Sequence, residues 1–159
     1  MLELKVLCLL VVANGVPVIV QYLLKDRLSA PLDGGYIWID RRPLLGNSKT
    51  VRGVIAALIV TPVAAKLLGI GFFLGLMIGF YAMLGDALAS FIKRRRGVEP
   101  SSRMPGIDQI PESLLPLVVT KDITDFSWLM IFLLVMVFTV LEVTVSPLLY
   151  RLHIRKRPY

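Results

Sequence analysis

The stretch GIGFFLGLMIGFYAMLGDALASFI, from Gly69 to Ile92, decides the class of this protein. It is long enough to cross a bilayer as a helix, which takes about 20 residues, and its only charged residue is Asp86. Glycine recurs at every fourth position, at Gly71, Gly75 and Gly79, a spacing that lets a second helix approach closely. The stretch therefore predicts a transmembrane helix that packs on a neighbour through small residues.

The rest of the chain has the same apolar character. Of its 159 residues 56% are hydrophobic, and the mean hydropathy is +0.74, whereas soluble domains have about 45–50% apolar residues. Because lipid-exposed backbone must satisfy its own hydrogen bonds, we expect an all-α integral membrane protein forming a single domain over residues 1–159. Hydropathy gives five transmembrane segments, of which the fourth is short: Val6–Leu24, Gly53–Leu68, Gly69–Ile92, Ser113–Thr120 and Trp128–Tyr150.

The distribution of positive charge predicts the orientation. The formal net charge is +7, and apart from Lys5, Lys66 and Lys121 every lysine and arginine lies in one of three stretches: Lys25–Arg52, Lys93–Arg103 and Arg151–Arg157. Positive charge of this kind marks cytoplasmic segments between membrane spans rather than a nucleic-acid surface. Five transmembrane helices place all three stretches in the cytoplasm, whereas four would separate the last from the others. We therefore expect a multi-pass protein of the cell membrane with its N-terminus outside, its C-terminus in the cytoplasm, and two cytoplasmic loops that form the active site.

Asp86 is the first candidate for chemistry. A charge within a span is expensive and is by default a functional residue, although a structural ion pair with a loop lysine or arginine is the alternative. Asp86, Ser90 and Lys93 are spaced i, i+4 and i+7, so they share one helical face. That face is expected to present a carboxylate, a hydroxyl and an ammonium group at the cytoplasmic end.

A second acidic candidate, Asp108, follows the turn Pro105-Gly106. Two carboxylates together with phosphate oxygens and water form a typical Mg²⁺ site. The sequence contains one cysteine, Cys8, and one histidine, His153, so a zinc site built from these residue types is disfavoured. The expected cofactor is therefore Mg²⁺, held by Asp86 and Asp108.

The segment before the second span is a candidate phosphate site. Backbone amides at a helix N-terminus, together with lysine and arginine, bind phosphate well, and the segment is not a P-loop because it lacks that glycine–lysine spacing. For Arg41 and Arg42 an ordinary positive flank is the favoured interpretation. The phosphate interpretation is favoured for the residues that follow, with these candidates: Asn47, Ser48, Lys49, Thr50 and Arg52.

Two acids for a metal and several cations for phosphates, at the level of the lipid headgroups, suit phosphoryl or nucleotidyl transfer. In such reactions positioning and charge neutralisation do most of the catalysis. The alternatives from the residues alone are a small membrane transporter or channel subunit, which would place its acids along a midplane path, and a non-catalytic membrane adaptor. The residues themselves do not name the nucleotide.

Three motifs carry a resemblance to a known family. They are Gly85-Asp86-Ala87-Leu88-Ala89-Ser90-Phe91-Ile92-Lys93-Arg94, then Gly97-Val98, then Pro105-Gly106-Ile107-Asp108-Gln109. This pattern resembles the signature of membrane CTP:lipid-phosphate cytidylyltransferases, and with Gly46-Asn47-Ser48-Lys49-Thr50-Val51-Arg52-Gly53 it is most similar to the archaeal CDP-archaeol synthases. The resemblance covers roughly Asp33 to Glu112.

The resemblance implies a reaction and a set of roles. CTP and 2,3-di-O-geranylgeranylglyceryl phosphate would give CDP-archaeol and pyrophosphate with Mg²⁺, in membrane phospholipid biosynthesis. Asp86 and Asp108 would hold the metal and, with Lys49 and Arg52, form the catalytic set. The CTP site would consist of Asn47, Ser48, Lys49, Thr50, Arg52, Ser90, Lys93, Gly106 and Gln109.

The chain departs from the bacterial pattern at the end of this region, where Gln109 replaces an arginine and Pro111 stands in the place of the final aspartate. Glu112 is a candidate substitute for that aspartate, and Glu142 in the last span is either a further site residue or a buried structural pair. Besides CTP and the prenylated lipid phosphate, the expected partners are membrane lipids; a homodimer stays open, and nucleic acid is not expected.

Overall fold

The computed structural model describes residues 1–99, 102, 104 and 106–153. Within these residues the regular structure is helical, apart from two isolated bridges in the loop before α2. The helices are α1 (Leu2–Leu24), α2 (Val51–Leu67), α3 (Phe72–Arg95), α4 (Gln109–Val119), the single turn α5 (Lys121–Thr124) and α6 (Trp128–Arg151). The all-α prediction is confirmed, and every predicted segment coincides with a helix.

The helices differ in their capacity to span a membrane. Among the described residues, α1, α3 and α6 are long and apolar enough to cross by length and composition. The other two predicted spans are shorter, since α2 has 17 residues and α4 has 11. The segment predicted at 113–120 begins earlier than expected, because α4 starts at Gln109 and takes Glu112 into its first turn.

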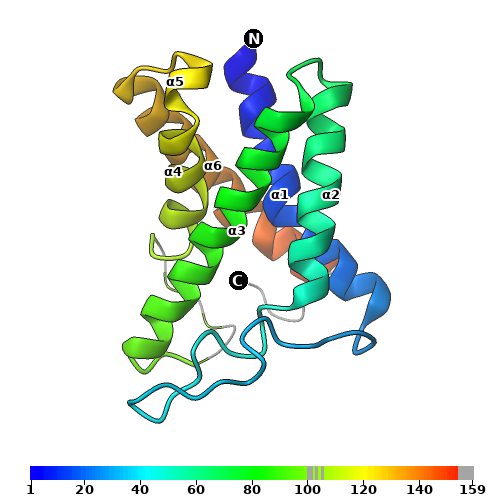
Figure 1. Cartoon of the computed structure of the whole chain (residues 1–159), viewed down its shortest axis with the longest axis vertical. Helices are drawn as coiled ribbons and strands as arrows, with labels where there is room; N and C mark the ends of the chain where they lie inside the picture. The colour runs from blue at the N-terminus through cyan, green and yellow to red at the C-terminus, as the bar shows by residue number, and fades with distance from the viewer. Residues whose placement is uncertain (100–101, 103, 105, 154–159) are drawn as a thin grey trace.

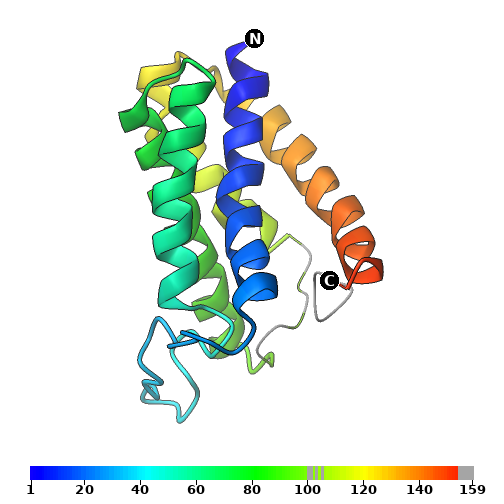
Figure 2. The same cartoon turned by 90° about the vertical axis from the view of Figure 1, so that its right-hand side faces the viewer.

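The long helices form an elongated bundle with its connections segregated by end (Figures 1 and 2). The N-terminus, the α2–α3 turn and α5 lie at one end. The long α1–α2 loop, the end of α3 and the end of α6 lie at the other. The described basic residues of the three stretches therefore lie toward one end of the bundle, as the charge pattern predicted.

The apolar core fills the half of the bundle nearer the N-terminus. It draws on the early part of α1, α3 and α6 and on the later part of α4, with members that include Leu9, Ile78, Leu117, Ile131 and Phe138. Helices α1, α3 and α6 run in the same direction and α4 runs in the opposite direction, so those parts lie at the same level (Figure 2). The other half of the bundle is left for polar side chains.

Small residues set the distance between α2 and α3. A Cβ atom at Gly75 would come within 2.8 Å of the Cα atom of Pro62, and one at Gly79 within 3.2 Å of the Cβ atom of Thr61. The predicted packing role of these two glycines is confirmed. It is wrong for Gly71, which precedes α3 as its N-cap with φ of 109° and would meet nothing within 4 Å.

Gly85 sets the distance between α3 and α4. A Cβ atom there would lie 2.5 Å from the carbonyl carbon of Pro111, closer still to its oxygen, and 2.8 Å from the Cα atom of Glu112. No side chain fits in that space without moving α4. Since Gly85 precedes Asp86, this close crossing places the first turn of α4 beside the face of α3 that carries Asp86.

Candidate active site

A polar cavity occupies the half of the bundle near the loops. Its volume is about 670 Å³, and its lining comes from every long helix, from α4 and from the loop before α2. Polar and charged residues that line it include Gln21, Lys25, Ser48, Lys49, Thr50, Asp86, Ser90, Lys93, Arg94, Asp108, Gln109, Glu112, Glu142 and Ser146. Sites of this size in proteins hold nucleotide-sized ligands.

The loop before α2 and the middle of α3 meet through Lys49 and Asp86. The ammonium group of Lys49 forms an ion pair with the carboxylate of Asp86, and the two side chains are 22% and 25% exposed. At this depth a bare carboxylate would be costly, so the lysine compensates a charge that sequence analysis placed within a span. The structure thus brings together residues 37 positions apart in sequence.

A second ion pair lies on the same face of α3. The ammonium group of Lys93 is 2.5 Å from Asp108, at the N-terminus of α4, and it also donates to the backbone carbonyl of Ser102 at 3.1 Å. The other carboxylate oxygen of Asp108 accepts from the backbone N–H of Met104 at 2.9 Å. Asp86, Ser90 and Lys93 all line the cavity, so the shared face predicted from their spacing is confirmed.

Asp33 organises the loop that carries Lys49. One of its carboxylate oxygens accepts from the backbone N–H groups of Leu45 and Gly46 at 2.8 and 3.0 Å, and the other from Gly35 at 3.0 Å. Burial raises the pKa of Asp33, but these donors outweigh burial and hold the pKa below its ordinary value. Sequence analysis did not select Asp33; its only signal was the turn-forming pair Gly34-Gly35 that follows it.

Only part of the predicted phosphate segment lies at the cavity. Ser48, Lys49 and Thr50 line the cavity, and the Thr50 hydroxyl also caps α2 by accepting from the backbone N–H of Gly53 at 3.4 Å. Asn47 is exposed and does not line the cavity. The cavity-facing part of the predicted segment is therefore the three residues immediately before α2.

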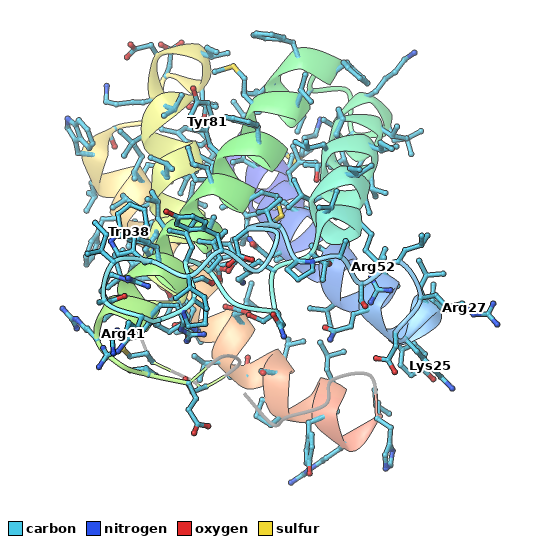
Figure 3. All side chains as sticks on the ribbon, turned by 60° about the horizontal axis from the view of Figure 1, so that its bottom comes forward. Lys25, Arg27, Trp38, Arg41, Arg52 and Tyr81 are labelled. Atoms are coloured by element: carbon cyan, nitrogen blue, oxygen red, sulfur yellow. The ribbon has the colours of Figure 1, made fainter. Side chains whose placement is uncertain are left out.

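Arg52 is placed elsewhere than expected. Its guanidinium donates to the backbone carbonyl of Arg27 and, at 2.5 Å, to that of Lys25, so it holds the end of α1 against the start of α2. Figure 3 shows Arg52 on the same side of the molecule as Lys25 and Arg27, and Arg52 is not among the residues that line the cavity. In this structure Arg52 therefore positions the loop, and its expected contact with CTP phosphates stays a prediction.

Two further arginines tie the loop to α3. Arg95 is 2.5 Å from Asp40, and its guanidinium lies over the ring of Phe91 at 5.1 Å; Trp38 packs edge-on against the same ring. Arg42 donates to the carbonyl of Arg95 at 3.0 Å. The sequence offered a plain positive flank for Arg42, but the structure uses it to cap the last turn of α3.

The start of α4 supplies a further cavity residue. Gln109 is buried at 6% exposure and lines the cavity, while its side-chain oxygen accepts from the backbone N–H of Gly106 at 3.1 Å. Gly106 has φ of 83° and lies outside the cavity lining. Gly106 therefore shapes the turn that delivers Asp108 and Gln109. Pro105 lies outside the described residues.

Glu112 and Glu142 also line the cavity. Glu112 is 5% exposed, its side chain hydrogen-bonds to Glu142, and its Oε1 atom has no hydrogen-bond partner within the described residues. Sequence analysis left open whether either belonged to the site. The structure places both in the cavity wall, with Glu142 reaching it from α6.

The donor set suits a hard cation that is shared with a substrate. Within the part of the chain that the structure describes, no three acidic, histidine or cysteine residues form a group able to hold a metal ion. Asp86 and Asp108 offer carboxylate oxygens in one cavity, and Mg²⁺ is commonly held by one or two carboxylates plus substrate phosphates and water. The residues therefore fit Mg²⁺ with a phosphate-bearing ligand, and not a metal site made by protein alone.

A helical bundle with membrane-spanning helices and a polar, ion-paired cavity near its basic end defines the class of intramembrane proteins with a charged interior cavity. The family described as CarS-like, CDP-archaeol synthase, matches residues 4–159. The chain therefore belongs to the CDP-archaeol synthase family.

Curated relatives agree with this assignment. The chain is 33% identical to a CDP-archaeol synthase of Sulfurisphaera tokodaii, over 81% of each chain, and 31% identical to one of Natronomonas pharaonis, over 81% of this chain and 84% of the other. A CDP-archaeol synthase of Hyperthermus butylicus is 36% identical over 62% of this chain and 59% of its own length, so the matched region spans less than two thirds of that relative.

The fold also has a solved counterpart. A structure described as an intramembrane enzyme for archaeal membrane lipids biosynthesis superposes with a TM-score of 0.70 at 26% identity, covering 86% of this chain and 90% of the other. The resemblance drawn from the sequence motifs is confirmed, and the interpretation as an enzyme is supported over the transporter and adaptor alternatives.

Proposed function

We propose that this chain transfers a cytidylyl group from CTP to the phosphate of 2,3-di-O-geranylgeranylglyceryl phosphate, releasing pyrophosphate. The observation that carries the proposal is the convergence of Lys49, Asp86, Lys93 and Asp108 from three separate elements in one cavity at the basic end of the bundle. The family name supplies the product class. The pairing of carboxylates with lysines supplies the chemistry, because a triphosphate needs both a metal and cations.

The reaction requires no protein nucleophile. An oxygen of the lipid phosphate, already anionic at neutral pH, forms the new bond to the α-phosphorus of CTP. The bond from that phosphorus to the bridging oxygen breaks, and its electron pair leaves with pyrophosphate. Lys49 and Lys93 are positioned to neutralise phosphate oxygens as charge moves to the leaving group, while Ser90 and Gln109 offer hydrogen bonds from the same wall.

Asp86 and Asp108 are the residues that would hold Mg²⁺. When bound, Mg²⁺ supplies charge neutralisation for the phosphates and for the departing pyrophosphate. In this proposal Arg52 does not contact the phosphates of CTP, because its guanidinium is engaged with loop carbonyls.

Five membrane crossings, with the cavity end in the cytoplasm, fit this function. In support, the end of α3 and the start of α6 lie at opposite ends of the bundle (Figure 1), so α4 and α5 lead the chain from one end of the bundle to the other. At about 1.5 Å per residue α4 alone covers about 16 Å, and packing against α3 rather than exposure to lipid accommodates its shortness. The positive charge of the loops supports an orientation with the N-terminus outside and the active site in the cytoplasm.

The test is incorporation of labelled CTP into a lipid-extractable product by the purified protein, with Mg²⁺ and the prenylated glycerol-ether phosphate. We expect a CDP-lipid from the wild type and a loss of more than about 100-fold in Asp86→Asn and Asp108→Asn, with folding in detergent retained. Thr144→Val is a matched control, because Thr144 lies on an exposed face of α6. No product from folded wild-type protein would refute the proposal and return the transporter and adaptor interpretations.

A further inference from the structure

Both candidate metal-binding carboxylates are engaged by lysines that the proposed function assigns to CTP phosphates. Asp86 is paired with Lys49 and Asp108 with Lys93. The same groups are thus needed twice, since the aspartates must face a metal and the lysines must face a triphosphate. How these groups are shared determines whether Mg²⁺ and CTP bind independently or together, an inference that rests on the proposed function.

Neither ion pair can simply be opened. The side chains of Lys49 and Asp86 are 22% and 25% exposed, and those of Lys93 and Asp108 are 11% and 21% exposed. A charge left alone at such depth loses much of its hydration, and breaking a buried pair by removing one partner is strongly unfavourable. Each lysine therefore leaves its carboxylate only when another anion receives it.

The metal and the lysines compete for the same oxygens. Mg²⁺ in contact with Asp86 would lie within a few ångströms of the ammonium group of Lys49, and two cations at that separation in a partly buried site repel strongly. Mg²⁺ alone consequently has to displace a lysine that has no other anion to meet.

The converse holds for CTP alone. A triphosphate would draw Lys49 and Lys93 away from Asp86 and Asp108, and this leaves two carboxylates bare beside further negative charge. The described residues also contain no group of three acidic, histidine or cysteine ligands, so Mg²⁺ depends on substrate oxygens to complete its coordination.

We infer that Lys49 and Lys93 act as exchangeable counter-ions, which neutralise Asp86 and Asp108 until Mg²⁺ takes over the carboxylates and the lysines pass to the phosphates of CTP. Mg²⁺ and CTP then bind as a coupled pair, and neither binds well alone. The coupling is reciprocal: the factor by which Mg²⁺ strengthens CTP binding equals the factor by which CTP strengthens Mg²⁺ binding.

The test is calorimetric titration of the full chain in detergent, with no turnover involved. CTP is titrated with EDTA present and with Mg²⁺ present, and Mg²⁺ is titrated without nucleotide. For the wild type we expect Mg²⁺ to strengthen CTP binding by more than about tenfold, within the usual range of coupling between sites. CTP that binds equally well in EDTA would overturn the exchange.

Two variants separate exchange from a general effect of charge. Lys49→Met frees Asp86 for the metal, so Mg²⁺ alone should bind about fivefold more tightly and its coupling to CTP should fall toward about twofold. Lys25→Met removes a cation that lines the same cavity but belongs to neither ion pair, and it should change Mg²⁺ affinity less than about twofold. Equal effects of the two substitutions would overturn the inference.

The outcomes also separate this inference from the proposed function. Wild-type protein that binds no CTP even with Mg²⁺ contradicts the proposed function. Wild-type protein that binds CTP and makes CDP-lipid, but shows no coupling, contradicts only the exchange. Should Lys49→Met fail to fold, Lys93→Met tests the second pair by the same titrations, and the wild-type coupling decides the question independently.

Discussion

Gly85 is the position where one added methyl group should most damage the site. The methyl carbon of Gly85→Ala would lie 2.5 Å from the carbonyl carbon of Pro111 and 2.8 Å from the Cα atom of Glu112. Carbon atoms pack at about 3.5–4.0 Å, so the backbone of α4 must retreat by about 1 Å. This backbone cannot rotate away as a flexible side chain would.

Two opposing effects decide the sign of the stability change. Replacing glycine by alanine inside a helix gains about 1 kcal/mol, whereas forcing backbone apart in a packed core costs about 1–3 kcal/mol. The clash exceeds the gain, so the free energy of unfolding should fall by up to about 2 kcal/mol. The larger effect is on catalysis, because a displacement of 1 Å at a reacting centre can reduce the rate about 100-fold.

The assay compares turnover of CTP to CDP-lipid with thermal unfolding in detergent. Gly15→Ala is the matched control, since Gly15 also lies inside a helix and a Cβ atom there meets nothing within 4 Å. We expect Gly15→Ala to be at least as stable and as active as the wild type. If Gly85→Ala behaved like Gly15→Ala, the close crossing of α3 and α4 would not position Asp108, and the reasoning would be refuted.

Two other perturbations probe the loop before α2. Arg52→Met should weaken CTP binding by no more than about threefold, because the guanidinium of Arg52 holds the carbonyls of Lys25 and Arg27. Lys49→Met should weaken CTP binding in Mg²⁺ by more than about tenfold. If calorimetry gave the reverse ranking, Arg52 and not Lys49 would be assigned to the phosphates. Asp33→Asn removes the charged acceptor of three backbone N–H groups and should raise the KM for CTP about fivefold, with kcat changed less. Because the pKa of Asp33 is lowered in the folded loop, its stabilisation is complete above the unfolded value of about 3.9 and is lost as pH falls through the lowered pKa. The fluorescence of Trp38, which packs on the end of α3, should therefore stay constant from pH 7 to about pH 4.5 and change below about pH 4; a change centred near pH 6 would exclude Asp33 as its cause.

Hydropathy and helical periodicity were sufficient for the elements and for one face of the site. The predicted span Gly69–Ile92 lies largely within α3, because an apolar segment of that length has one stable conformation in lipid. Asp86, Ser90 and Lys93 share a wall of the cavity because the helix repeat fixes their relative directions. Both results depend on interactions within one segment, which sequence analysis can follow.

The start of α4 was harder to predict from the sequence, because it depends on tertiary contacts. Glu112 interrupts the apolar pattern, so hydropathy began the segment at Ser113, whereas α4 starts at Gln109. The charge is tolerated there because α4 packs on Gly85 and turns Glu112 into a polar cavity rather than toward lipid. Hydropathy averaged along the sequence includes the charge of Glu112 but carries no information about the residues that surround it in the fold.

The sequence by itself determined the membrane class and supplied the residue types that nucleotidyl transfer requires, and its positive charges predict an orientation. Only the tertiary structure decided where each cation lies: Lys49 and Lys93 reach carboxylates in the cavity, while Arg52 binds carbonyls of the loop. A positive side chain at a helix end suits a phosphate, a carboxylate or a carbonyl oxygen equally well. The choice among them depends on which segments the fold brings within about 3 Å, a non-local outcome that no local pattern encodes.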